Sequence, residues 1–509
     1  MPTAPFSTET GRALRDLGHL LWFRRATARR RTRSNVALVL VALFTAGAAV
    51  GPAYAGAYRT PDRTSDVLAM IPAALAAFLL VGVTSGVASG GGRELIARDR
   101  AVAFPVSPTT DHLGALLLTP LNLAWLVQTW VLLAATAFAV GPGGLAAAQI
   151  LVALWIAAAT AAAQAVAWLV EAVRRGPAGI LVVRLVALVV VAVGAGVYAT
   201  GRYGAVVDEL PTREVVLAAV AAGQGRWTAW WVVAGTLAAL IPVLVVAGGP
   251  AAHLVARRPP RDEVRIESGV RRPRPAPRGD RTALLRLDRA SVWRVVPMRR
   301  GIAVLAVGPG LVGIAGGLGW QQLTVLPGLV ASGAALLFGV NAWCLDGRGV
   351  LWRESLPVDP SAVYDARVIM LLEVLLVSSG LTVVLGGVRA GLPTAAELAA
   401  ILCTWLVVTM QVMSASMRWS HRRPFAIDLR SARATPAPPA VMIGYSARLA
   451  LSATLTGLVF SALAELAVWQ PAVLVAVPFL AVSGIRLLKA RAAWLDPAQR
   501  VRIVSAVAG

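Results

Sequence analysis

Lysine is almost missing from this chain of 509 residues, because 47 of its 48 basic residues are arginines. A Walker A P-loop, G-x-x-x-x-G-K-[ST], needs a lysine that reaches the phosphates. The one lysine, Lys489, lies in "RLLKARA" and is followed by alanine. The chain therefore has no standard P-loop, and it cannot hydrolyse ATP by that route on its own.

Cysteine and histidine are equally scarce. The two cysteines, Cys344 and Cys403, have neither the spacing of a metal site nor that of a disulfide framework. The four histidines lie far apart in the sequence. We therefore expect no metal site, no catalytic residues and no enzyme activity in this chain.

Charge is also low, at 14% of residues against about 25% in ordinary soluble domains. Hydrophobic residues make up 57%, and the mean hydropathy is +0.70. Several apolar runs approach the 20 residues that a helix needs to cross a bilayer, and they lack the alternation of a membrane barrel. The sequence predicts an all-α polytopic membrane protein. The net charge of +23 lies in arginines between the runs, which indicates membrane topology and not nucleic acid.

About twelve transmembrane helices are predicted, six in each half of the chain. Their expected ranges are 36–58, 67–90, 115–140, 145–170, 180–201, 227–250, 302–320, 323–345, 368–388, 394–417, 441–463 and 469–488. The outer loop 202–226 is apolar enough for short helices that dip into the membrane. Tryptophans near predicted span ends, Trp230 and Trp343 among them, are expected to be interface anchors.

The distribution of basic residues predicts the orientation. With the N-terminus inside, 40 arginines and lysines fall in inner segments and six in outer loops. This bias favours an orientation with both termini cytosolic. The membrane itself is expected to be the cytoplasmic (inner) membrane of a bacterial cell. Six spans per half is an even number, so the halves are expected to be parallel repeats. We expect a first half at 1–252, a basic Pro-rich linker at 253–280, and a second half at 281–509.

Each half opens with a basic amphipathic segment, Arg12–Arg31 and Arg281–Arg300. Such a segment can lie on the cytosolic membrane surface with its apolar face toward the lipid. The simpler alternative is ordinary basic sequence flanking a span. Because both halves repeat the segment before their first span, we favour the surface helix.

A proline element occurs twice, as "FPVSP" at Phe104–Pro108 and "LPVDP" at Leu356–Pro360, and its two copies are 252 residues apart. Ser107 and Asp359 are good N-cap residues, and Pro108 and Pro360 suit the first position of a helix. Both copies fall in inner loops between the second and third spans of their halves. The element predicts a sharp corner followed by a new helix.

The layout, together with "RELIARDRAVAFPVSP" and "GVLWRESLPVDP", resembles the ABC-2 type (type V exporter-like) transporter permeases. The resemblance covers the chain as two tandem permease domains. It implies an amphipathic connecting helix before each domain, and a coupling helix between the second and third spans that touches an ATPase subunit. It also implies re-entrant helices between the fifth and sixth spans. The short outer loop near 465–469 departs from the family pattern.

The resemblance implies a partner and a set of coupling residues. The partner is a separate P-loop ATPase, expected in two copies, which binds the ATP and Mg²⁺; this chain binds no cofactor itself. The lipid bilayer is the other partner, and nucleic acid is not expected. The implied ATPase-coupling loops contain Glu94, Arg98, Arg100, Phe104, Pro105, Ser107, Pro108, Arg353, Glu354, Leu356, Pro357, Asp359 and Pro360.

Polar residues inside predicted spans are candidates for the transport pathway. They are Asn122, Gln128, Gln164, Glu373 and Gln411. For the amides, a hydrogen bond between helices is the commoner role. Two alternatives stay open: an ion-coupled secondary carrier, which should have more charge in mid-span, and a non-transporting membrane scaffold, which would not need two matched corners.

Overall fold

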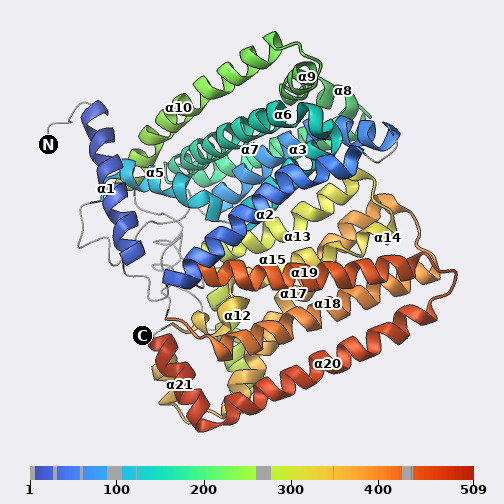
Figure 1. Cartoon of the computed structure of the whole chain (residues 1–509). Helices are drawn as coiled ribbons and strands as arrows, with labels where there is room; N and C mark the ends of the chain where they lie inside the picture. The colour runs from blue at the N-terminus through green and yellow to red at the C-terminus, as the bar shows by residue number, and fades with distance from the viewer. Residues whose placement is uncertain are drawn as a thin grey trace. The chain divides into compact units, whose positions relative to one another are not determined.

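The computed structural model describes residues 6–26, 31–57, 61–88, 106–121, 123–258, 275, 277–347, 349–426, 437 and 439–509. Every regular element within these ranges is a helix (Figure 1). The chain divides into two compact units, Met1–Val264 and Arg265–Gly509. The division falls inside the expected linker, although the preceding helix continues to Arg257.

The chain is a multi-pass membrane protein. In the described ranges, nine helices are long and apolar enough to cross a membrane, or ten if one bent pair is counted as a span. The helix α7 (Gly179–Ala199) shows why lipid must surround them, because no residue of its apolar window is buried. Leu188, for example, is 64% exposed. A face of this kind would aggregate in water. The number twelve stays a prediction.

Unit 1 begins with α1 (Phe6–Ala26), and the helices that follow it match the predicted spans closely. They are α2 (Arg31–Ala57), α3 (Pro61–Ala88), α5 (Pro108–Leu118), the 3-10 turn η1 (Thr119–Leu121), α6 (Leu123–Arg174), α7, α8 (Tyr203–Asp208), α9 (Thr212–Gly223) and α10 (Thr228–Arg257). The short helices α8 and α9 confirm that the loop 202–226 is helical. The predicted third span, 115–140, is wrong at its start, because the chain turns at η1, which contains Pro120, before α6 begins.

The helix α6 is a hairpin of two antiparallel legs. Gly141 has a φ of 70° and a ψ of −176°, a conformation that breaks the helix and suits glycine, and Pro142 follows it. Across the hairpin, the Trp125 indole donates to the Thr160 hydroxyl (2.9 Å), and the Gln149 amide donates to the Leu133 carbonyl (2.9 Å). The two legs correspond to the third and fourth predicted spans.

Unit 2 has the same opening order of an amphipathic helix and a long apolar one. Its elements are α12 (Asp280–Arg294), α13 (Val296–Gly316), α14 (Trp320–Leu323), α15 (Leu326–Leu337), η2 (Gly339–Leu345), α16 (Gly349–Glu354), α17 (Pro360–Ala390), α18 (Ala395–Arg422), α19 (Pro439–Ala464), α20 (Gln470–Leu495) and α21 (Pro497–Ala508). The predicted span 323–345 is not one regular helix, because the backbone departs from helical geometry at Asn341. The helix α21 was not predicted.

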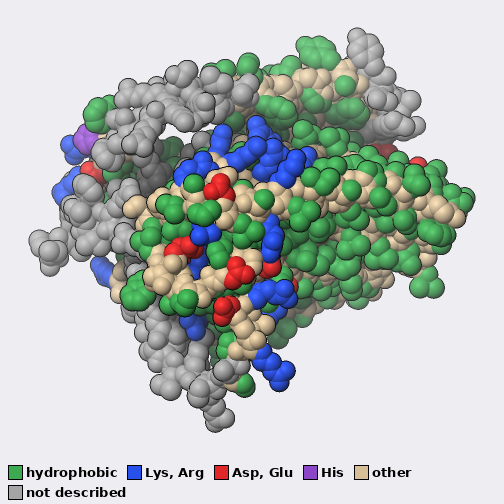
Figure 2. Space-filling view, turned by 90° about the horizontal axis from the view of Figure 1, so that it is seen from below, with side chains coloured by type: hydrophobic (Ala, Val, Ile, Leu, Met, Phe, Trp, Pro, Cys, Tyr) green, Lys and Arg blue, Asp and Glu red, His purple; other side chains and the backbone are tan. Residues whose placement is uncertain are grey.

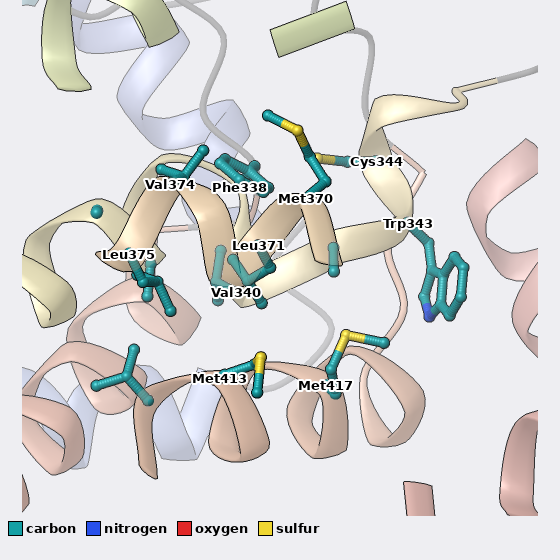
Figure 3. Close-up of a cluster of buried hydrophobic side chains, with 14 of the residues drawn as sticks. Phe338, Val340, Trp343, Cys344, Met370, Leu371, Val374, Leu375, Met413 and Met417 are labelled. Carbon is teal, nitrogen blue, oxygen red and sulfur yellow. The ribbon is translucent and has the colours of Figure 1, made fainter. Parts of the chain in front are cut away.

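The core of unit 2 lies around the first half of α17. Figure 3 shows Leu371, Val374 and Leu375 of α17 in one cluster with Phe338, Val340 and Met413 of α18. All of these side chains are buried. Burial of large side chains is worth about 1.5–3 kcal/mol each in water. Within a bilayer, close packing of this kind supplies the association of the helices.

The surface has two different characters. In the view from below, charged side chains gather over one part of the face, while hydrophobic side chains cover a continuous neighbouring part (Figure 2). In unit 2, exposed charged side chains include Arg289 of α12, Glu354 of α16 and Arg502 of α21. All of these elements belong to parts of the sequence that were predicted to lie on the inner side of the membrane. One end of the unit is therefore polar and the remainder is suited to lipid.

We predict that Gly56→Ala destabilises unit 1 while Gly51→Ala on the same helix does not. A Cβ on Gly56 of α2 would overlap the Phe138 carbonyl oxygen of α6, whereas a Cβ on Gly51 meets nothing within 4 Å. Overpacking costs about 1–3 kcal/mol. Thermal unfolding in mild detergent measures the difference, and equal melting temperatures for the two variants would contradict the close crossing of α2 and α6.

Candidate functional site

Both proline elements begin a helix, as predicted. In unit 2, Asp359 caps α17 by accepting from the Ser361 N–H (2.9 Å), and Pro360 occupies the first turn. These bonds from Ser361 lower the pKa of the Asp359 carboxyl. In unit 1, the Ser107 hydroxyl caps α5 by accepting from the Thr110 N–H (3.1 Å). The N-cap residue and the proline that predict each helix start are adjacent in the sequence, so this prediction did not depend on how the helices pack.

The helix α16, directly before the second corner, has two different faces. Val350 and Arg353 point inward and are buried. Leu351, Trp352 and Leu356 point outward, and Trp352 is 78% exposed. Among the expected coupling residues, Glu354, Pro357 and Asp359 are also exposed. The structure therefore gathers these residues of the second loop on one short helix and the corner that follows it.

The corresponding loop of unit 1 lies outside the described residues. This applies to Glu94, Arg98, Arg100, Phe104 and Pro105, and also to the pathway candidate Asn122. Of the element Phe104–Pro108, only Val106, Ser107 and Pro108 are described. Their role as coupling residues stays a prediction.

An ion-pair network stabilises the second corner. Its inner part consists of Asp288, Asp346, Arg353 and Arg367, and its outer, more exposed part of Glu354 and Arg500. Arg367 of α17 is 1% exposed and donates to both oxygens of Asp288 on α12, at 3.0 Å each. It also donates to Asp346 (2.8 Å) and to the Ala342 carbonyl oxygen. One guanidinium thus joins α12, η2, α17 and the residue that follows η2.

The ion-pair network continues outward to α16 and α21. Arg353 of α16 pairs with the second oxygen of Asp346 and reaches Glu354 at 3.3 Å. Glu354 in turn pairs with Arg500 of α21 at 3.2 Å. Three acidic and three basic side chains balance in the ion-pair network. Balance matters because a buried charge without a partner is strongly destabilising.

The electrostatics at Asp288 show this dependence. Burial raises the pKa of the Asp288 carboxyl, and the Arg367 guanidinium beside it counteracts that shift. Without the arginine, a carboxylate at this position would lose its charge or leave the interior. Asp288 of α12 and Arg367 of α17 therefore each need the other to remain charged in the interior.

An aromatic stack covers the inner side of the ion-pair network. The rings of Trp343 and Trp494 lie 3.9 Å apart and nearly parallel, at 10°, and His421 stacks on Trp343 at 5.7 Å. The Arg353 guanidinium lies 5.8 Å from the Trp343 ring and 5.7 Å from the Trp494 ring, within cation–π range. The Trp494 indole donates to the carbonyl of Pro360 (2.9 Å), which connects α20 to the corner.

The stack corrects one prediction. Trp343 was expected to be an interface anchor, but it is completely buried, and Trp230 is buried as well. Trp230 donates to the Ala147 carbonyl (2.9 Å) inside unit 1. Trp227 and Trp231 are exposed as anchors should be. Position near a span end did not distinguish the two groups.

The first corner is held by different chemistry. The Thr109 hydroxyl, next to the corner, donates to Glu9 of α1 (2.9 Å) and contacts His253 Nε2 of α10 (3.0 Å). His253 and Glu9 lie 3.1 Å apart. Nearby, buried His112 donates from Nε2 to the Val245 carbonyl (2.9 Å), and its desolvation lowers its pKa. In each unit, therefore, the amphipathic first helix bonds to the helix that starts at the proline element.

Two of the pathway candidates, Glu373 and Gln411, have ordinary bonding partners. Glu373 pairs with Arg289 of α12 (2.9 Å), near the polar end of unit 2. Gln411 accepts from the Thr456 hydroxyl (3.1 Å), which joins α18 to α19. Gln164 is buried on the second leg of α6, and Gln128 is half-buried on the first. Gln128 and Gln164 belong to unit 1, whereas Glu373 and Gln411 belong to unit 2. None of the four lines the apolar groove of about 770 Å³ between α2 and α6.

Comparisons with protein families, with curated proteins and with solved structures found no match to this chain. Among the described residues, no group of three or more His, Cys, Asp or Glu side chains could hold a metal ion. The resemblance to exporter permeases therefore rests on the sequence layout and the two loop sequences alone.

We predict that Arg367→Met destabilises unit 2 by about 3–5 kcal/mol, because it leaves Asp288 and Asp346 buried without their partner. The matched control is Glu373→Gln, which breaks a half-exposed ion pair on the same helix and should cost less than about 1 kcal/mol. Thermal or denaturant unfolding in detergent measures both. Equal losses for the two variants would show that the ion-pair network is not the main constraint.

Proposed function

We propose that the chain is the membrane-spanning permease of an ABC-type exporter, and that a separate ATPase chain drives it. One observation carries the proposal: Leu351, Trp352 and Leu356 form an exposed apolar surface directly before a capped corner. Leu351 and Trp352 lie on α16, whose other face is fixed by the buried Arg353–Asp346 ion pair, and Leu356 follows this helix. A rigid short helix with exposed anchors has the character of a docking element.

The position of this surface argues against lipid as its occupant. Asp346, Arg353 and Glu354 are charged, and all three belong to α16 or to the turn before it. Charged groups are costly in the hydrocarbon core of a bilayer. On α16 the arginine, Arg353, is buried and paired, so Leu351 and Trp352 lack an exposed guanidinium of their own helix that could bind a lipid phosphate. A protein partner explains this apolar surface better.

Because this chain has no standard P-loop, nucleotide binding is assigned to the partner chain. ATP and Mg²⁺ bind to the partner, and this chain supplies the membrane path. The two proline elements give two docking corners, so two ATPase copies are expected. In this account the chain crosses the cytoplasmic membrane twelve times as two parallel six-helix repeats, with both termini and both corners in the cytosol.

The ion-pair network gives a route from the docking element to the membrane helices. Movement of α16 acts on Arg353, then on Asp346, and through Arg367 on α17 and α12. Trp494 couples the same corner to α20. Closure of the ATPase pair would therefore move several spans of unit 2 together, as alternating access requires.

We predict that Trp352→Ala combined with Leu351→Ala lowers recovery of the ATPase by on the order of tenfold or more, because exposed aromatic anchors dominate binding energy. The tagged full-length chain would be purified from its host in mild detergent, and the accompanying proteins quantified by mass spectrometry. The matched control is Leu392→Ala, a change at a 98% exposed leucine just after the opposite end of α17.

The wild-type chain and the Leu392 variant should both bring a stoichiometric P-loop ATPase. The proposal fails if the wild-type chain is recovered alone under conditions that preserve other membrane complexes. The docking role of α16 fails if an ATPase accompanies all three proteins equally. Melting temperatures of the three purified proteins should agree, since all the altered side chains are exposed.

A further inference from the structure

The amphipathic helix α12 runs nearly at right angles to the helix that follows it. The segments Asp280–Arg294 and Met298–Ile314 make an angle of 81°. Because α13 packs along α17, a membrane-length helix, it runs in the direction of the spans. The helix α12 therefore lies close to the plane of the membrane surface.

The buried face of α12 is turned toward its own unit and not toward lipid. Asp288 and Val292 are buried, and Asp288 bonds to Arg367 of α17. One residue later on α12, Arg289 pairs with Glu373, which also belongs to α17. Part of the apolar face of α12, Val292 with Leu284 and Leu285, therefore packs inside the unit, while Leu287 and Trp293 stay exposed.

The opposite face of α12 is basic and aromatic. Arg286, Leu287, Trp293 and Arg294 are exposed, and Trp293 is 50% exposed. Arg286 and Trp293 are seven residues apart, which places them on the same side of the helix. Within the described part of the chain, Arg286 and Arg294 form no ion pair; Arg286 donates only to the Pro275 carbonyl (2.7 Å).

Helix α1 of unit 1 repeats this arrangement. Its inner residues Ala13 and Leu17 are buried, while Arg12, Arg15 and Trp22 are exposed, Trp22 to 71%. Arg15 and Trp22 are again seven residues apart. The two helices differ in sequence and in the contacts of their inner faces. The Arg–Trp outer face that they share is therefore not a consequence of similar inner contacts.

We propose that the outer faces of α12 and α1 bind the headgroups of anionic phospholipids in the adjacent leaflet. Arginine recognises a lipid phosphate through two parallel hydrogen bonds, and tryptophan lies at the boundary between headgroups and acyl chains. The exposed Leu287 and Trp293 beside the arginines favour a lipid over a free anion, because a free anion has no apolar part to cover them. The proposal depends on membrane insertion alone and is independent of transport.

The test compares lipid retention on the full-length protein. Native mass spectrometry in mild detergent would count phosphatidylglycerol and phosphatidylcholine molecules retained by the wild-type chain and by the combined variant Arg286→Gln with Arg294→Gln. We expect the wild type to retain phosphatidylglycerol preferentially. Retention should fall roughly fivefold for each arginine replaced, and phosphatidylcholine should not change.

The matched control is Arg202→Gln with Arg213→Gln, two exposed arginines near α8 and α9 of unit 1. This variant should retain phosphatidylglycerol as the wild type does. Trp22→Ala provides a second probe on α1 and should also lower phosphatidylglycerol retention. Melting temperatures near that of the wild type verify that each variant is folded.

Three results would overturn the proposal: equal retention of the two lipids by the wild type, unchanged phosphatidylglycerol on the Arg286/Arg294 variant, or an equal loss on the control variant. Displacement of phosphatidylglycerol by equimolar inorganic phosphate would indicate a bare anion site and would contradict lipid recognition as well. Retention that falls with rising salt supports the proposal, because headgroup attraction is screened.

Discussion

Unit 2 depends on one buried guanidinium. Arg367 lies between Asp288 and Asp346 and also donates to a backbone carbonyl, so it fixes α12, α17, η2 and the residue after η2 at a single point. The cost of burying such a charge is large and is offset only when every partner is present. The arrangement of the polar end is therefore cooperative: loss of one partner leaves the others unsatisfied.

The bilayer supplies the complementary constraint. Apolar faces such as that of α7 are stable only in lipid, and charged groups are stable only outside it or in complete networks. Both corners satisfy this condition by bonding the amphipathic first helix of the unit to the helix after the proline element. Unit 1 uses Glu9, Thr109 and His253, and unit 2 uses Asp288 and Arg367. The same connection is built twice from different side chains.

Much of the fold could be predicted because its signals are local. Apolar runs indicated the long helices, and Ser107 and Asp359 indicated two helix starts that the structure confirms. The helix α21 was missed although Asp496 and Pro497 give the same start signal; Asp496 accepts from the Ala498 N–H at 3.0 Å. A capped start after the last predicted span should have indicated a further helix.

The ion-pair network could not be predicted in this way. Asp288 and Arg367 are 79 residues apart, and each resembles an ordinary loop charge in the sequence. Trp343 has the position of an interface anchor but lies in the stack with Trp494. Which side chains meet depends on how the helices pack, and helical periodicity does not contain that information.

The proposed function requires the polar end of unit 2, with α16, to face the cytosol. Cysteine labelling tests it most directly, in a background with Cys344→Ala and Cys403→Ala. The substitutions Trp352→Cys and Leu392→Cys would place single thiols at exposed positions beyond opposite ends of α17. A membrane-impermeant maleimide should label the Leu392 variant in intact cells and the Trp352 variant only after permeabilisation. The reverse pattern would contradict the orientation and, with it, docking of a cytosolic ATPase on α16.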